Sequence, residues 1–203
     1  MKRKNTNIEI PDIHRDISLI KRLVIVVLGG FDSVLDREGQ LYFRLLCRLI
    51  DKAADEYLTS REYIMEEIKT KDKLAYRFSM IDHLENCINA INRAIKTFTC
   101  LNEKRSNILN FVSAEIVSRI KEYSVSNVRN RIEHIDEDIL GNKFEGSVFL
   151  DINENYSQIC INNKCLPFID LASMIENYHN FVLEIFNNFP NRCEKGIYYY
   201  DKK

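Results

Sequence analysis

The short stretch from Arg129 to His134 contains the residue types of this sequence best suited to chemistry. A histidine with a pKa near its ordinary value of about 6.5 takes up and releases a proton at neutral pH. An arginine neutralises the charge that grows on a phosphorus atom under attack, and it holds two oxygens at once. RNA supplies its own nucleophile, the 2′-hydroxyl group. Arg129 and His134 therefore predict cleavage of a phosphodiester without a metal ion.

The apolar residues around this stretch predict the helix that must position it. Valine and isoleucine recur at steps of three or four from residue 125 to residue 139, and Gly141 ends the pattern. On an ideal helix, Asn130 and His134 lie one turn apart, opposite this apolar stripe, and Arg129 lies on the flank. A histidine on an outer face needs shelter, which a second copy packed across a two-fold axis provides. We therefore expect a homodimer in which two motif helices form one cleft.

The segment from Arg129 to His134, RNRIEH, resembles the RNxxxH form of the Rx4–6H motif of the HEPN superfamily (higher eukaryotes and prokaryotes nucleotide-binding). Its members are all-α bundles with this motif on a late helix. Many are dimers, and many are metal-independent endoribonucleases of toxin–antitoxin and antiviral systems. The resemblance implies that Arg129 and His134 are the catalytic pair, that Asn130 is a supporting polar residue that orients them, and that no cofactor is needed. It also implies RNA as the substrate and a cognate antitoxin protein as a partner.

Acidic residues around the motif keep other interpretations open. They are Glu133, Asp136, Glu137 and Asp138. Asp136 stands where toxins paired with a nucleotidyltransferase antitoxin often have a tyrosine. The continuation EHIDE, followed by a small hairpin and a last helix, resembles HEPN proteins of unassigned function more than the toxins. Helical spacing offers Arg129 an ion pair with Glu133, and offers His134 one with Glu137 or Asp138. The alternative function is therefore a HEPN module that binds nucleotides or proteins without catalysis. A third alternative is a structural helical protein in which the motif is a coincidence.

A basic run at the start of the longest predicted helix is a candidate RNA-binding surface. Lys71, Lys73 and Arg77 would guide RNA if they flank the cleft of His134. If they do not, they form an ordinary solvated face. The other histidines are isolated and are predicted to be polar surface or satisfied core residues: His14, His83 and His179. Because no two histidines share a ligand spacing and no CxxC pair occurs, we expect no metal site.

Composition disfavours several other classes of protein. Among 203 residues there are 6 glycines and 3 prolines, and neither type occurs between Gly39 and Gly141. Strand-rich folds need turns built from these residues, so a sandwich, a barrel, a Rossmann sheet and a glycine-rich phosphate loop are all disfavoured. Lysine and arginine number 29 against 30 aspartates and glutamates. Any phosphate ligand must therefore be held by a local cationic patch.

Helical spacing of apolar residues covers most of the chain and predicts an all-α fold. We expect an antiparallel helical bundle with a small β-hairpin inserted before the last long helix, at about residues 146–166. The sequence predicts a single domain over residues 1–203, with a loosely held tail at about 191–203. Helices are expected at about residues 13–28, 40–58, 60–68, 74–98, 109–120, 125–140 and 168–189.

The cysteines and the apolar runs predict where the protein resides. The 6 cysteines are scattered, and Cys160 and Cys165 flank a turn. This pattern is typical of a reduced, intracellular protein. The longest apolar run, residues 23–28, is far shorter than the roughly 20 residues that cross a bilayer. We expect a cytoplasmic protein that does not enter a membrane.

Overall fold

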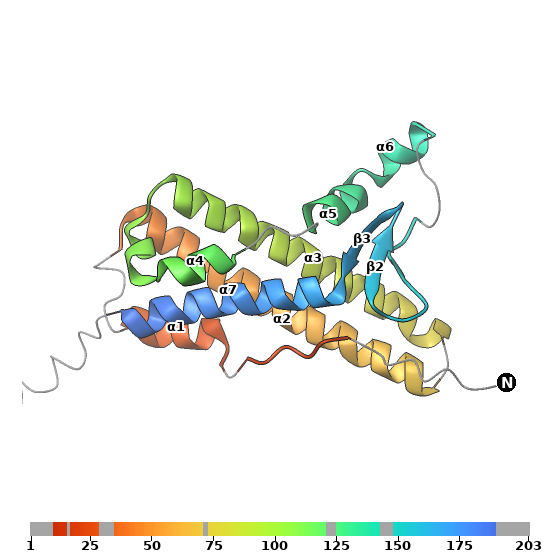
Figure 1. Cartoon of the computed structure of the whole chain (residues 1–203), viewed down its shortest axis with the longest axis horizontal. Helices are drawn as coiled ribbons and strands as arrows, with labels where there is room; N and C mark the ends of the chain where they lie inside the picture. Colours follow the sequence, from red (N-terminus) through yellow and green to blue (C-terminus); the bar gives the residue numbers. More distant parts are fainter. Residues whose placement is uncertain are drawn as a thin grey trace, which may run out of the picture. The chain divides into compact units, whose positions relative to one another are not determined.

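The computed structural model describes residues 10–15, 17–28, 35–70, 73–120, 125–142 and 148–189, with the side chains of 73–75 left out (Figure 1). The described chain is mainly helical and has a small three-stranded antiparallel sheet before the last helix. The helices are α1 (Leu19–Leu28), α2 (Arg37–Thr70), α3 (Lys73–Glu103), η2 (Asn107–Phe111), α4 (Ala114–Arg119), α5 (Val125–Glu133), α6 (Ile135–Leu140) and α7 (Phe168–Asn188). The strands are β1 (Asp151–Ile152), β2 (Gln158–Ile161) and β3 (Lys164–Pro167). No helix in these ranges is both long and apolar enough to span a bilayer.

Backbone contacts group the chain into two compact units. Unit 1 comprises residues 1–14, 52–92 and 121–176, and unit 2 comprises residues 15–51, 93–120 and 177–203. The helices α2, α3 and α7 contribute residues to both units. The predicted tail at 191–203 lies outside the described residues.

In unit 1, α2 and α3 run antiparallel and are joined by ring and ion contacts. Nδ1 of His83 lies 2.5 Å from a carboxylate oxygen of Glu56. The ring of His83 stacks on Tyr63 at 5.6 Å between centroids, and Tyr63 lies against Tyr76 at 6.1 Å. Later positions of α2 therefore face earlier positions of α3. His83, expected to be isolated, has an acidic partner.

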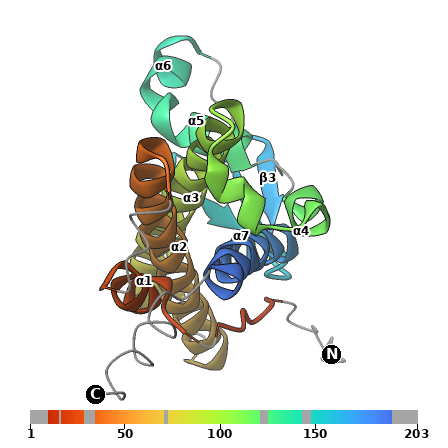
Figure 2. The same ribbon diagram turned by 90° about the vertical axis from the view of Figure 1, so that its left-hand side faces the viewer.

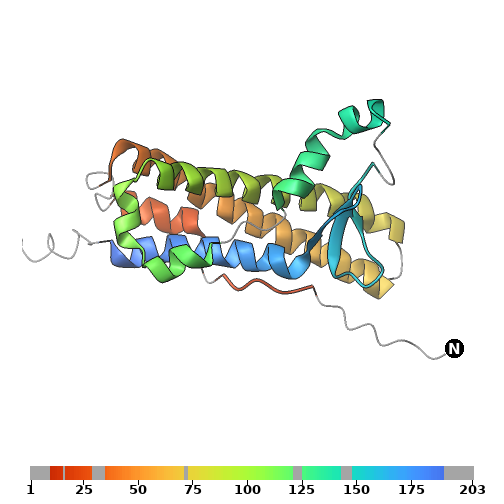
Figure 3. The same cartoon turned by 45° about the horizontal axis from the view of Figure 1, so that its top comes forward.

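The small sheet of unit 1 has the order β1-β2-β3, and its last strand leads to the start of α7 (Figure 3). The turn between β2 and β3 has two residues, Asn162 and Asn163, with φ angles of 42° and 63°. Asparagine tolerates this left-handed region better than most residues, which favours a tight hairpin here. The expected hairpin is thus confirmed as part of a three-stranded sheet. β3 passes into α7 without an intervening loop.

Cys160 and Cys165 occupy facing positions of β2 and β3 and form a disulfide. Their Cα atoms are 4.1 Å apart. The prediction that the cysteines are reduced is therefore wrong for this pair, because strand register brings the two thiols together. Cys47 of α2 and Cys87 of α3 are free and buried.

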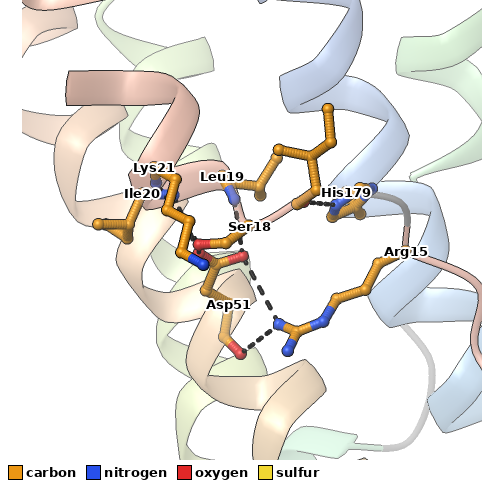
Figure 4. A network of polar contacts seen from close by, with 8 residues as sticks. Arg15, Ser18, Leu19, Ile20, Lys21, Asp51 and His179 are labelled. Carbon is orange, nitrogen blue, oxygen red and sulfur yellow. Dashed lines mark hydrogen bonds and ion pairs between the residues drawn. The ribbon is translucent and has the colours of Figure 1, made fainter. Parts of the chain in front are cut away.

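In unit 2, α1 begins at Leu19 rather than near residue 13, because Asp51 of α2 binds its first turn (Figure 4). The carboxylate of Asp51 accepts the hydroxyl of Ser18 at 2.6 Å. It also accepts the backbone N–H groups of Leu19 at 3.0 Å and Ile20 at 2.9 Å. These are donors that a helix start leaves unpaired. Arg15 lies 3.8 Å from the same carboxylate.

Asp36 plays the corresponding part for α2. It accepts the N–H of Gly39 at 2.6 Å and the N–H of Asn107 at 2.7 Å. The hydroxyl of Ser106 donates to it at 3.0 Å. A Cβ atom on Gly39 would lie 2.8 Å from Oγ of Ser106, so a larger residue here would have to displace this hydroxyl. The carboxylate thereby joins the start of α2 to the start of η2.

Two further predicted helix boundaries differ from the structure. The helix expected at 109–120 is divided into η2 and α4, because Ser113 starts a new helix by accepting the N–H of Ile116. The expected boundary near residues 59 and 60 is absent, and α2 continues through it. The hydroxyls of Thr59 and Ser60 donate to carbonyls of the preceding turn instead of capping a new helix.

Candidate functional site

The helix expected to run straight through the motif is divided at His134 into α5 and α6. His134 has φ −109° and ψ 23°, in the bridge region of backbone space. Hydrogen bonds still cross the junction, from His134 N–H to Asn130 and from Asp138 N–H to His134, both at 3.0 Å. The division follows the packing: Val125 and Val128 of α5 are fully buried, whereas Leu140 of α6 is 84% exposed.

A surface cavity lies where α5 meets the hairpin. Its volume is about 270 Å³, and it is lined by Asn127, Asn130, Arg131, His134 and Lys164. α5 packs against β2 and β3 and lies beside β3 in two perpendicular views (Figures 1 and 2). The cavity therefore combines one imidazole, two amides and two cationic side chains.

His134 reaches this cavity with its imidazole 54% exposed. Nδ1 lies 3.3 Å from a carboxylate oxygen of Glu137. Among the described residues, Nε2 has no hydrogen-bond partner, so this nitrogen is available to a ligand. Of the two acids proposed for His134, Glu137 is confirmed, and Asp138 instead forms an ion pair with Arg131.

Arg129 does not line the cavity. Its guanidinium forms an ion pair with Glu133, one turn along α5, as the spacing predicted. Nη1 also donates to Oδ1 of Asn130 at 3.3 Å. The side chain is 21% exposed. The structure thus brings Asn130 and His134 together at one cavity and leaves Arg129 tied to an acid on its own helix.

The predicted basic run is not assembled at this cavity. Arg77 forms an ion pair with Asp151 and lines a different cavity of unit 1. Lys71 and the side chain of Lys73 lie outside the described residues. Of the three residues, the one whose side chain is described therefore does not flank His134.

Sequence reasoning missed three lining residues. Asn127 precedes Asn130 by three positions and His134 by seven, so helical spacing alone would have added it to the motif face. Arg131 was passed over although it lies inside the motif. Lys164 carries no local signal, because it reaches the cavity only through the pairing of β3 with β2 and the packing of α5 on both strands.

In comparisons with known proteins, no family model, no curated protein and no solved structure matches this chain. The site is therefore interpreted from its own geometry and from the motif.

Proposed function

We propose that this chain is a HEPN-type endoribonuclease that cleaves RNA without a metal ion, as a homodimer with the helical bundle of that superfamily. The observation that carries the proposal is the cavity in which Asn130 and His134 meet Arg131 and Lys164. Two cations and two amides bind phosphate oxygens, and a half-exposed imidazole with one unengaged nitrogen moves protons. The motif resemblance adds a defence setting with a cognate antitoxin protein.

The reaction assigns one role to each group. Nε2 of His134 accepts the proton of the RNA 2′-hydroxyl, and the 2′-oxygen forms a bond to phosphorus. The bond from phosphorus to the 5′-oxygen breaks, and that oxygen takes a proton from water as it leaves, while His134 later returns its own proton to water. The products are a 2′,3′-cyclic phosphate and a 5′-hydroxyl. Lys164 neutralises the phosphate and Asn130 orients it. Arg131 and Arg129 hold it after exchanging Asp138 and Glu133 for phosphate.

Dimerisation through the motif helices is supported by exposed apolar residues of α6, the helix that follows His134. Ile139 and Leu140 of α6 are 47% and 84% exposed. A second copy packed here would bury these side chains and would bring a second Arg129 and a second His134 to the same cleft.

The alternative function, a non-catalytic HEPN module, is favoured by the acidic partners. Arg129 is paired with Glu133, and His134 with Glu137. These carboxylates compete with phosphate for both members of the predicted catalytic pair. A nucleotide base or a partner protein would not meet this competition.

The deciding experiment incubates labelled RNA with the protein in EDTA. We expect the wild-type chain to cleave it and His134→Ala to lower the rate by about 100-fold or more. Glu137→Gln is the matched control: it removes the acidic partner of the imidazole but keeps the imidazole, so cleavage persists. Equal cleavage by wild type and His134→Ala, or none by either, would overturn the proposal. A nucleotide that raises the melting temperature of such an inactive chain would then support the alternative module.

A further inference from the structure

A second and larger cavity of unit 1 shares no lining residue with the motif cavity. Its volume is about 400 Å³, and it opens between the β1–β2 turn and the facing parts of α2 and α3. Its polar lining residues are Glu67, Arg77, Asp151, Asn153, Glu154 and Tyr156. Nothing in the proposed ribonuclease reaction uses this cavity.

Glu67 is the unusual member of the lining. It is only 3% exposed, although glutamate is almost never fully buried without a partner. The hydroxyl of Tyr156 donates to its Oε1 at 3.2 Å. Among the residues that the structure describes, Oε2 has no hydrogen-bond partner. A buried acceptor left unpaired is unfavourable, so this atom marks a position that a ligand can satisfy.

Tyr156 is held over Glu67 by a turn that leaves it little freedom. The φ angle of Tyr156 is 55°, a left-handed conformation that is uncommon for tyrosine. Oδ1 of Asn153 accepts the N–H groups of Ser157 at 2.8 Å and Gln158 at 3.1 Å, which fixes the turn. Burial, and then the nearby charge of Glu67, raise the pKa of Tyr156, so its hydroxyl remains a donor. Tyr156 thus keeps an uncommon backbone conformation at the wall of the cavity.

The charges of the lining select the ligand. Arg77 is engaged by Asp151, which leaves Glu67 and Glu154 as negative charges that no cation among the described lining residues balances. A metal ion would need several oxygen ligands. Here Tyr156 holds one oxygen of Glu67, and Arg77 holds Asp151. A single N–H donor needs only the unpaired Oε2.

We propose that this cavity binds an organic cation with N–H donors, an ammonium or guanidinium group, which donates a hydrogen bond to Oε2 of Glu67. The cation also lies in the field of Glu154 at the rim. Two sources share this chemistry: a free amine, and the basic side chain of a partner protein.

The experiment measures the melting temperature of the full chain at constant ionic strength against four probes. Agmatine represents a free amine and Nα-acetyl-arginine amide a protein side chain, whereas tetramethylammonium and Mg²⁺ carry charge without an N–H donor. We expect a saturable rise in melting temperature with agmatine or the blocked arginine, and none with the other two. The stronger of the two active probes identifies the source.

Three variants test which carboxylates bind the cation. Glu67→Gln replaces the open acceptor with a donor and is expected to weaken binding at least tenfold. Glu154→Gln changes only an exposed rim charge, so it folds even if Glu67→Gln does not, and is expected to weaken binding several-fold. Glu66→Gln, the neighbour that pairs with Lys69 outside the cavity, is the matched control and keeps full binding. Absence of binding by every probe, an equal response to tetramethylammonium, or unchanged binding in both cavity variants would overturn the proposal.

Discussion

At the scale of single residues, carboxylates pair with the candidate catalytic side chains and line the second cavity. Glu133 and Glu137 form ion pairs with the two side chains predicted to be catalytic. Glu67 is buried, and one of its oxygens has no hydrogen-bond partner among the described residues. The first two pairings were predictable, because they follow from spacings of four and three along one helix. The burial of Glu67 was not, because its partner Tyr156 comes from a turn 89 residues later.

Asp36 makes the stability of the fold depend on pH. Burial tends to raise the pKa of Asp36, but hydrogen bonds from the N–H groups of Asn107 and Gly39 and from the hydroxyl of Ser106 outweigh it. The folded protein therefore holds this pKa below its ordinary value of 3.8. Where the pKa is lowered by folding, the unfolded chain binds the proton first as the pH falls. The stabilisation that the Asp36 carboxylate provides is complete above about pH 5. It is lost progressively as the pH falls below about 4.

We predict that Asp36→Asn lowers the free energy of unfolding by about 1 kcal/mol at pH 7, because one acceptor of two backbone N–H groups becomes a donor. The difference from wild type should shrink as the pH falls from 5 to 3, since protonated aspartate resembles asparagine. Urea unfolding followed by circular dichroism at pH 7, 5, 4 and 3 measures it. A difference that stays constant over this range would contradict the assigned role of the carboxylate.

At the scale of elements, apolar periodicity predicted the presence of helices better than their ends. The pattern from residue 74 to residue 98 is confirmed by α3. The start of α1 and the division of α5 from α6 were missed for one reason. The first boundary is set by Asp51 of a distant segment, and the second lies at the end of the helix that packs on β2 and β3. Periodicity within a segment carries no information about such contacts.

The disulfide of the hairpin makes a prediction about redox conditions. The bond closes a loop between positions only five apart, and chain entropy gives such a short loop about 2 kcal/mol of stabilisation. The double variant Cys160→Ser/Cys165→Ser should lose this amount in urea unfolding. Dithiothreitol should lower the wild type to the same level and leave the double variant unchanged. If dithiothreitol lowered both proteins equally, the effect would not come from this bond.

At the scale of the whole molecule, the proposed ribonuclease requires a second copy. We predict that the chain is a dimer at tens of micromolar and that Leu140→Lys weakens the dimer at least tenfold, because a charge replaces an apolar side chain at the interface. Leu28→Lys in α1 is the matched control, since Leu28 is 83% exposed and Leu140 84%. Sedimentation equilibrium measures both. A monomeric wild type, or equal weakening by the two variants, would exclude a cleft shared through α6.

The candidate site shows which of its residues could be predicted from the sequence and which could not. Asn130 and His134 were placed on one face correctly, because both belong to one helical segment. Lys164 was not foreseen, since its place depends on a tight turn and on the register of two strands. The cavity of Glu67 draws its lining from α2, α3 and the β1–β2 turn, and no local pattern connects those three segments.

The position of Asp51, whose carboxylate binds the start of α1, also has a consequence for folding during synthesis on the ribosome. Ser18, Leu19 and Ile20 depend on a residue 31 to 33 positions further along the chain. Proteins emerge from the N-terminus, and an isolated helix of ten residues is marginal in water. A nascent chain that ends before Asp51 therefore lacks the carboxylate that accepts the first N–H groups of α1. Among the described helices, the first can receive this cap only after Asp51, within α2, has left the exit tunnel.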